Sequence, residues 1–205
     1  MQSPSKTFYN LPASKRSMLL RIAYQEFASN PYNAASITRI VKEMNIAKGS
    51  LYQYFENKQA LYKYLVSNAK NKLTDILRKA CPIDWAITFD QWYFQYLLIS
   101  IKFYLEFPVY ACLLYLHYSE TCNEVKAFRT ANIKCDIAFL SQAVKKNDTL
   151  TNSLGYQKCR APLGLFEGLV FDKEIDLNHY IITNQTIYIT TDDVYNLVKQ
   201  EIGKG

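Results

Sequence analysis

One short run of this sequence, Lys48-Gly49-Ser50-Leu51-Tyr52, places an ammonium group, a hydroxyl and a phenol within five positions. Such groups donate hydrogen bonds to phosphate oxygens, and a serine hydroxyl can also bond the edge of a base. Leu51 and Phe55, four residues apart, predict that the run is helical. The chemistry it indicates is recognition of an anionic partner, although surface charges of this kind are also often only solvated.

The basic residues are concentrated in the first part of the chain. Residues 1–80 hold 13 Lys and Arg against 4 Asp and Glu, whereas residues 81–205 hold 11 against 14. The net charge of +6 therefore comes from the first 80 residues. This asymmetry points to nucleic acid or an anionic membrane surface as the partner of the basic part, with a merely solvated basic face as the alternative.

The remaining reactive residues form no catalytic or metal-binding pattern. The sequence has no Gly-rich phosphate loop, nucleophile motif or HExxH, and its two histidines stand 62 positions apart. Five scattered cysteines without CxxC spacing suit reduced, cytoplasmic thiols. No secretory signal is recognisable, and the most apolar stretch, Gln91 to Ile101, is well short of the roughly 20 residues of a membrane span. We therefore expect a cytoplasmic chain that is not an enzyme, with no cofactor, metal or membrane partner.

Apolar residues spaced three and four apart predict four helices in the first part of the chain. They span about residues 12–29, 36–45, 48–55 and 57–80, and Ser36 and Asn57 are suitable N-caps for the second and fourth of them. Asn45, at the end of the second helix, tolerates the left-handed conformation of a helix terminus. Because only three or four residues separate the second helix from the third, the pair has the outline of a helix-turn-helix.

The residues from Ser36 to Leu61 closely resemble the N-terminal DNA-binding domain of the TetR family of bacterial transcriptional regulators. The most diagnostic part is Lys48 to Tyr52, followed by Phe55, Lys58 and Leu61. The resemblance implies an all-α fold in two domains. Residues 1–60 would be a three-helix helix-turn-helix DNA-binding domain, and residues 61–205 a helical domain for effector binding and dimerisation.

The resemblance also places side chains on DNA, since in this family the third helix enters the major groove. The DNA-binding residues that we predict are Ser36, Thr38, Arg39, Ala47, Lys48, Gly49, Ser50, Leu51, Tyr52, Tyr54 and Lys58. Lys48 would bring charge to a phosphate, and Gly49 leaves room for the duplex. Lys58 opposes the dipole at the start of the fourth helix, an arrangement that a nearby phosphate would relieve.

Two positions depart from the family pattern. Ala47 stands where Ser or Thr is usual, so the third helix lacks a side-chain N-cap, which costs roughly 0.5 to 2 kcal/mol. A hydrophobic staple between Ile46 and Leu51 would offset this loss. Asn45 stands where the family favours Gly, and asparagine tolerates a left-handed turn. These departures affect the expected affinity and sequence preference more than the fold.

The segment from Asp84 to Glu120 holds 12 aromatic residues in 37 positions. Rings at helical spacing usually form core and dimer contacts, but apolar and aromatic groups also line ligand cavities between helices. Because regulators of the TetR type bind small, often hydrophobic or aromatic, effectors in this domain, the resemblance favours a cavity. The ligand-binding residues that we predict are Trp85, Phe89, Trp92, Tyr93, Tyr96, Phe103, Tyr104, Tyr110, Tyr115 and His117.

The rest of the chain is less regular. Helices are expected at about 84–106, 108–119 and 121–145, and a polar loop at 147–157. The apolar run 163–171, with Gly164 and Gly168 four apart, would let another helix approach closely. Residues 179–191 have strand-like propensity, and only the resemblance makes them helical.

These observations lead us to expect a homodimeric, ligand-responsive repressor. Its partners would be a pseudo-palindromic double-stranded DNA operator and a small-molecule effector of unknown identity. The alternative is a basic, aromatic-rich peripheral membrane protein, which would bind anionic vesicles instead of duplex DNA.

Overall fold

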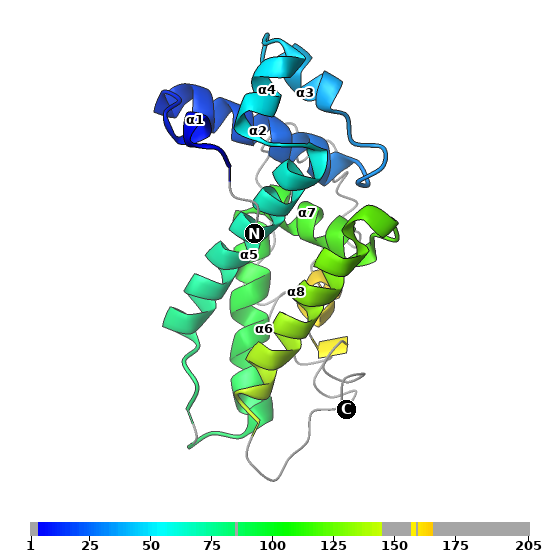
Figure 1. Cartoon of the computed structure of the whole chain (residues 1–205). Helices are drawn as coiled ribbons and strands as arrows, with labels where there is room; N and C mark the ends of the chain where they lie inside the picture. Colours follow the sequence, from blue (N-terminus) through cyan, green and yellow to red (C-terminus); the bar gives the residue numbers. More distant parts are fainter. Residues whose placement is uncertain (1–3, 85, 145–156, 159, 166–205) are drawn as a thin grey trace. The chain divides into compact units, whose positions relative to one another are not determined.

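The computed structural model describes residues 4–84, 86–144, 157–158 and 160–165. Within these ranges the chain is helical with connecting turns and contains no strand, which confirms the all-α prediction. The labelled helices (Figure 1) are α1 (Lys6–Tyr9), α2 (Ala13–Ser29), α3 (Ile37–Glu43), α4 (Lys48–Tyr54), α5 (Lys58–Ala80), α6 (Phe89–Glu106), α7 (Pro108–Ser119) and α8 (Asn123–Ser141). The expectations for Trp85 and for residues 147–156, 166–171 and 179–191 lie outside the described residues.

The chain forms two compact units, each assembled from separate stretches. The first unit contains Met1–Asn71 and Val109–Phe128, and so holds α1 to α4, most of α5, nearly all of α7 and the start of α8. The second unit contains Lys72–Pro108 and Arg129–Gly205. Its described part includes the end of α5, α6 and the rest of α8.

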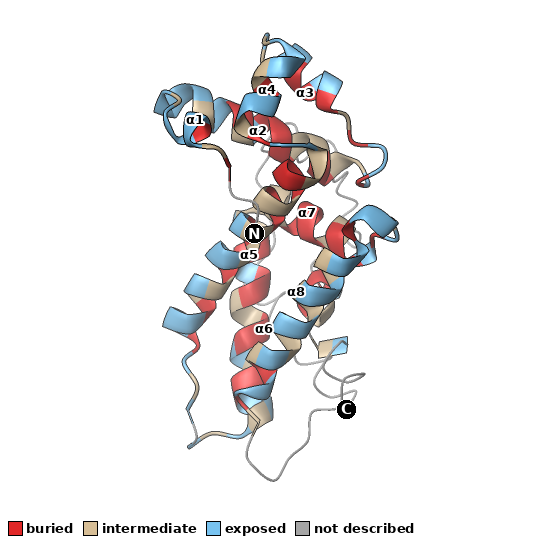
Figure 2. Ribbon diagram, in the orientation of Figure 1, coloured by how far each residue is buried: buried red, intermediate tan, exposed pale blue. Residues whose placement is uncertain are grey.

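The first unit is built around a shared apolar core. Helix α3 packs against both α2 and α4, and the short α1 packs against α4. The largest side chains of this core with less than 2% exposure are Phe8, Leu19, Ile22, Phe27, Ile40, Leu51, Leu61, Leu65 and Leu113. Each buried side chain of this size contributes about 1.5–3 kcal/mol relative to full exposure. Figure 2 shows these helices buried on their inner faces and exposed on their outer ones.

Local hydrogen bonds set the ends of the helices as the sequence predicted. The Ser36 side chain accepts a bond from the Arg39 amide and caps α3. At the other end Asn45 is left-handed, with φ 52°, and the next amide, Ile46 N–H, donates to the Val41 carbonyl (3.0 Å). This is a Schellman motif, which asparagine can form without glycine. Asn57 Oδ1 accepts the Ala60 amide (2.8 Å) and caps α5.

Helix α6 begins later than predicted. The expected start was about residue 84, whereas the helix runs from Phe89. Thr88 is the physical reason, because its side chain accepts the Gln91 amide while Gln91 Oε1 accepts the Thr88 amide (2.9 Å). Such a capping box fixes the first turn of a helix. Helix α7 starts at Pro108 as predicted, and α8 is shorter than the expected 121–145.

No single helix in the described residues is long and apolar enough to cross a membrane. Helices α6 and α7 reach the length and apolar composition of a membrane span only when they are counted together, and the chain bends between them.

Candidate nucleic-acid interface

Helix α4 has one inner and one outer face. Leu51 is 1% exposed and packs in the core of the first unit. Lys48 is exposed and Tyr52 is 41% exposed, and these two side chains lie one turn apart on the same side of the helix. Ser50 and Tyr54 are half-buried between the two faces. Leu51 therefore fixes the helix in place, while Lys48 and Tyr52 are accessible to a partner.

The N-terminal end of α4 is open and uncapped. A Cβ atom added at Gly49 would meet no other atom within 4 Å, so packing inside the chain does not require glycine there. Ala47 has the extended backbone of an N-cap, with φ −67° and ψ 145°, but no side-chain bond caps the helix. The Ser50 amide instead donates to the Ala47 carbonyl (2.9 Å). The missing cap expected from the sequence is thus a feature of the structure.

The start of α3 is held by an ion pair that sequence reasoning missed. Glu26, on α2, accepts the Arg39 Nε hydrogen with both carboxylate oxygens (3.0 Å each) and the Ser36 amide with Oε1 (2.7 Å). Arg39 also donates to the Ala34 carbonyl (2.7 Å), and its bonds to Glu26 raise the pKa of its guanidinium. The Arg39 side chain remains 55% exposed, so it holds α3 and also adds positive charge to the surface. Thr38, beside it, is exposed.

Lys58 points toward the connection before α3. Its ammonium lies 4.5 Å from the centre of the Tyr32 ring and 3.5 Å from the Asn33 carbonyl oxygen. Burial lowers the pKa of Lys58, and the charge of Glu124 opposes that shift. The side chain is half-buried, so the cation that the sequence assigns to a phosphate already has a ring and a carbonyl as neighbours.

The residues before α2 support the far end of α4, which no sequence pattern indicated. The Ser5 amide donates to the Tyr54 carbonyl (2.9 Å), and Ser5 Oγ donates to the Gln53 carbonyl. These bonds satisfy two carbonyl oxygens at the C-terminal end of α4. Phe8 is fully buried, with its ring centre 5.0 Å from that of Phe55. The chain start is therefore part of the frame that holds α4.

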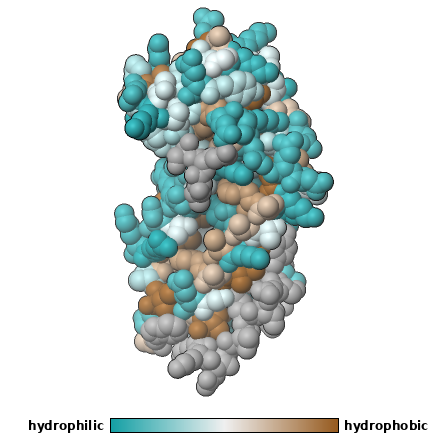
Figure 3. Space-filling view, viewed as in Figure 1, coloured by the Kyte–Doolittle hydropathy of each residue, from teal (hydrophilic) through white to brown (hydrophobic). Residues whose placement is uncertain are grey.

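Hydrophilic side chains dominate the part of the surface over α1 to α4 in Figure 3, at the top of the view. This distribution agrees with the exposed Lys48, Thr38 and Arg39 described above.

The predicted ligand-binding residues lie in different units. On α6, in the second unit, Phe89, Trp92, Tyr93 and Tyr96 form a stacked row in which three of the ring pairs have centres 5.7 Å apart and planes within 10–19°. Trp92, Tyr93 and Tyr96 are buried. Lys158 places its ammonium 4.3 Å from the Tyr93 ring centre. This row packs as a core of rings.

The other predicted ligand-binding residues are not part of that row. Phe103 and Tyr104 are buried further along α6, with ring centres 5.8 Å apart. Tyr110, Tyr115 and His117 lie on α7, in the first unit, and Tyr115 is half-buried. The ring centre of Tyr110 lies 4.8 Å from that of Tyr24, and the buried His117 bonds the Tyr62 hydroxyl through Nδ1 (2.9 Å).

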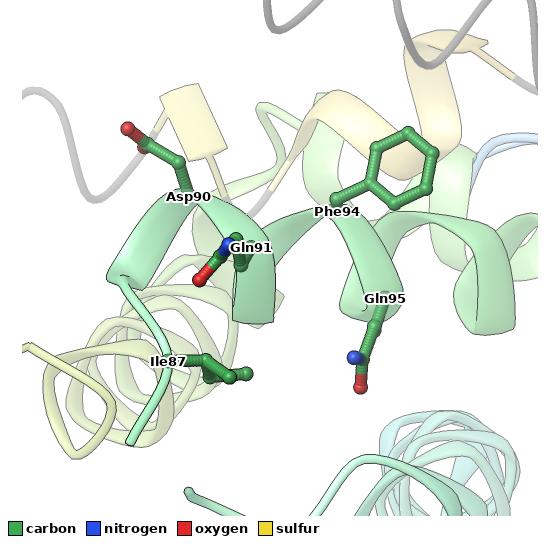
Figure 4. A pocket seen from close by; sticks show the side chains of 5 residues that line it. All are labelled: Ile87, Asp90, Gln91, Phe94 and Gln95. Atoms are coloured by element: carbon green, nitrogen blue, oxygen red, sulfur yellow. The ribbon is translucent and has the colours of Figure 1, made fainter. Parts of the chain in front are cut away.

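A cavity of about 480 Å³ opens at the start of α6. It is lined by Ile87, Asp90, Gln91, Phe94 and Gln95, shown in Figure 4. None of these is a predicted ligand-binding residue. The lining combines two apolar side chains with two amides and one carboxylate, and the pocket is wide open to solvent. The described residues contain no cluster of three or more metal-ligating side chains.

Residues 19–65 match the model of the family described as bacterial regulatory proteins, tetR family. The HTH-type transcriptional regulator YuxN of Bacillus subtilis is 40% identical over 47 residues. That alignment covers 23% of this chain and 16% of the length of YuxN.

Similar solved structures extend the likeness of the fold to the whole chain. A TetR family transcriptional regulator from Chloroflexus aurantiacus superposes with a TM-score of 0.73 at 24% identity, covering 98% of this chain and 96% of that one. The transcriptional regulator FadR from Bacillus subtilis, in complex with stearoyl-CoA, has a TM-score of 0.54 at 14% identity, covering 91% and 95%. Fatty acid degradation regulator FadR from Bacillus halodurans has a TM-score of 0.56 at 17% identity, covering 92% and 96%.

The family comprises DNA-binding regulators and not enzymes. The match over α2 to α5, the helix-turn-helix geometry of α3 and α4 and the shared fold agree with one another. Residues 19–65 therefore match the tetR family of bacterial regulatory proteins, and the fold of the chain is similar to that of a TetR family transcriptional regulator of known structure.

Proposed function

We propose that the chain is a homodimeric repressor that binds a pseudo-palindromic DNA operator through α4 and is released by a small hydrophobic or aromatic effector. The proposal of DNA binding rests on which side chains of α4 are buried and which are exposed. Leu51 holds this short helix from inside, Lys48 and Tyr52 extend outward, and the backbone at Gly49 is open. A helix presented in this way fits the major groove of duplex DNA.

Each of these residues of α4 makes a different contact with the duplex. Lys48 neutralises a phosphate, and the Tyr52 hydroxyl donates to a phosphate oxygen. Ser50 bonds a base edge or a phosphate, and Gly49 lets the backbone approach closely, since a larger side chain would hold the duplex away. Tyr54 and Ala47 complete the contact surface.

Helix α3 and the start of α5 supply the supporting contacts. Thr38 and Ser36 bind the phosphate backbone near the first turn of α3. Arg39 and Lys58, which are already engaged inside the unit, add positive charge that attracts the duplex.

Two copies of the chain would place two α4 helices on a symmetric operator, since a twofold dimer reads a palindrome. We assign DNA binding to residues 1–60 and effector binding and dimerisation to residues 61–205. The place of action would be the cytoplasm, where bacterial DNA lies.

The effector proposal rests on the second unit. The aromatic row on α6 and the cavity beside it, with Phe94 and Ile87 among its lining, offer apolar surface to a ligand. A protein of the same fold, FadR from Bacillus subtilis, is in complex with stearoyl-CoA. We therefore place the effector among small hydrophobic or aromatic molecules, with long-chain acyl compounds as the first to try.

Titration of the purified chain against duplex DNA from the region upstream of its own gene tests the DNA-binding proposal. A scrambled duplex serves as the comparison, and both are measured at two salt concentrations. We expect tight, salt-sensitive binding that prefers the upstream duplex. Equally weak binding to both would contradict the proposal, and binding to anionic vesicles instead would favour the peripheral membrane alternative.

Two variants assign that binding to α4. Lys48→Ala should weaken binding and lower the salt slope by about one unit, because one phosphate contact is lost. Lys79→Ala removes the same charge from an exposed position on α5 outside the interface, and should leave the slope unchanged.

Stearoyl-CoA and free stearate are the probes for the effector. We expect binding to raise the midpoint of thermal unfolding and to lower affinity for the upstream duplex, since the ligand favours one of two states. A probe that binds without changing DNA affinity would contradict its role as an effector.

A further inference from the structure

The turn between α7 and α8 is organised by one buried carboxylate. Glu120 is only 8% exposed, and its two oxygens accept three backbone amides. Oε1 accepts the amides of Thr121 (3.0 Å) and Cys122 (2.9 Å), which belong to the turn itself. Oε2 accepts the amide of Tyr32 (2.7 Å), which lies 88 positions earlier in the connection between α2 and α3. Glu120 thus shapes its own turn and also holds a distant segment.

Tyr32 is held at several points. Its hydroxyl donates to Glu124 Oε2 (2.8 Å), in the first turn of α8, and its ring centre lies 5.1 Å from that of Tyr62. Burial, together with the bond to Glu124, raises the pKa of the Tyr32 hydroxyl above its ordinary range, so this group stays a donor. The side chain is 3% exposed.

The same turn also holds the start of α5. The Gln59 side chain donates to the Glu124 carbonyl oxygen, and the Tyr62 hydroxyl bonds Nδ1 of His117 near the end of α7 (2.9 Å). Since Tyr32 precedes α3 and Gln59 follows α4, the α7–α8 turn holds the chain on both sides of the helix-turn-helix.

The connection before α3 is stiff enough to pass on this constraint. The amides of Ala34 and Ala35 both donate to the Pro31 carbonyl (3.0 and 2.9 Å), and the Ser36 amide is held by Glu26. Only four positions separate Tyr32 from Ser36, the N-cap of α3. A displacement at Tyr32 therefore moves the start of α3, and with it α4.

We propose that Glu120 is a positioning residue for DNA binding, which holds Tyr32 so that α3 and α4 keep one orientation toward the duplex. The proposal rests on the proposed DNA-binding function and adds its control by the α7–α8 turn. A chain whose helix-turn-helix samples several orientations binds in proportion to the fraction that is competent. Losing the bond should lower that fraction by about tenfold, which corresponds to 1.4 kcal/mol.

Glu120→Gln tests this with minimal change of shape. The amide oxygen can still accept the Thr121 and Cys122 amides, whereas its NH₂ group would face the Tyr32 amide, and two donors cannot bond each other. Tyr32→Phe is the milder variant, since it removes the bond to Glu124 and keeps the ring. Glu106→Gln is the matched control, because it removes one carboxylate from an exposed position on α6.

Two measurements are made on the full chain at a temperature where circular dichroism shows every variant folded. Hydrogen exchange should become faster at residues 32–40 in Glu120→Gln, and affinity for the upstream duplex should fall about tenfold. Tyr32→Phe should show a smaller loss, and Glu106→Gln should match the unmodified chain.

Unchanged exchange at residues 32–40 would overturn the proposal, because Glu120 would then not hold the connection. Faster exchange with unchanged DNA affinity would also overturn it, since the bond would then have only a structural role. Failure of the unmodified chain to bind any duplex is a distinct result that removes the proposed function itself.

Discussion

Replacing Ala47 by Ser should stabilise the chain by supplying the cap that α4 lacks. The backbone at this position already has the extended conformation of an N-cap, with φ −67° and ψ 145°, so no rearrangement is needed. A serine oxygen there could share the amide of Ser50, the third residue of α4, with the carbonyl of residue 47, which accepts that amide now. Capping of this kind is worth roughly 0.5 to 2 kcal/mol, typically about 1. For a chain of this size, about 1 kcal/mol raises the midpoint of thermal unfolding by roughly 2–4 °C.

Thermal unfolding without DNA measures the gain, and hydrogen exchange of α4 shows whether it arises there. Ala13→Ser is the matched control, because it adds the same hydroxyl to the exposed first residue of α2, outside the N-cap position. That change should stay within about 0.5 kcal/mol. Ser36→Ala should lose about what Ala47→Ser gains, since Ser36 already caps α3. If Ala47→Ser were no more stable than Ala13→Ser and α4 exchanged as before, the capping argument would be wrong.

Four further outcomes are expected. Gly49→Ala should keep or raise the free energy of unfolding, because the added Cβ meets no atom within the chain and alanine favours the helix. The same variant should weaken duplex binding, because the Cβ would hold the duplex away. Equal affinity of the variant and the unmodified chain in a titration would contradict this steric role of Gly49. Tyr52→Phe should weaken binding without changing stability, and thermal unfolding beside a titration would separate the two effects. Burial raises the pKa of Cys81 to about 11 and that of Cys112 to about 12, so both thiols stay protonated in the folded chain when unfolded thiols ionise. The contribution of these two thiols to the free energy of unfolding is complete below about pH 9 and is lost as pH rises through 11 and 12. Unfolding experiments at several pH values measure this loss. In Cys112→Ala the free energy of unfolding should depend less steeply on pH. Peptide mapping after alkylation at pH 8 should find Cys135, which is exposed, modified before either of them.

The sequence predicted those features of the fold that depend on neighbouring residues. The caps at Ser36 and Asn57 and the left-handed Asn45 follow from side chains that bond the backbone within three residues, or from local backbone preference. The start of α6 could have been predicted in the same way, because Thr88 and Gln91 have the spacing of a capping box. Helix α1, at four residues, is too short for hydrophobic periodicity to show.

Contacts between distant residues could not be predicted from the pattern. Nothing near Glu26 indicates that Arg39 is its partner, and nothing near Glu120 indicates Tyr32, because tertiary packing chooses these pairs. The same holds for the candidate ligand residues. Their order along the chain does not indicate that α6 and α7 contribute to different units, and the ligand site that the resemblance implies stays a prediction.

The first unit is completed only by residues 109–128, after the whole of α6 has been made. A ribosome that adds 5–20 residues per second takes about 3–11 s to pass from residue 72 to residue 128. During that interval the nascent chain holds α1 to α4 without the turn that contacts Tyr32, so the apolar surface that α7 later covers is open to chaperones or to aggregation. Contacts 88 and more positions apart also make folding slow, since the loop must close before the contacts form. Synthesis stalled before residue 128 would leave α1 to α4 without part of the unit to which they belong.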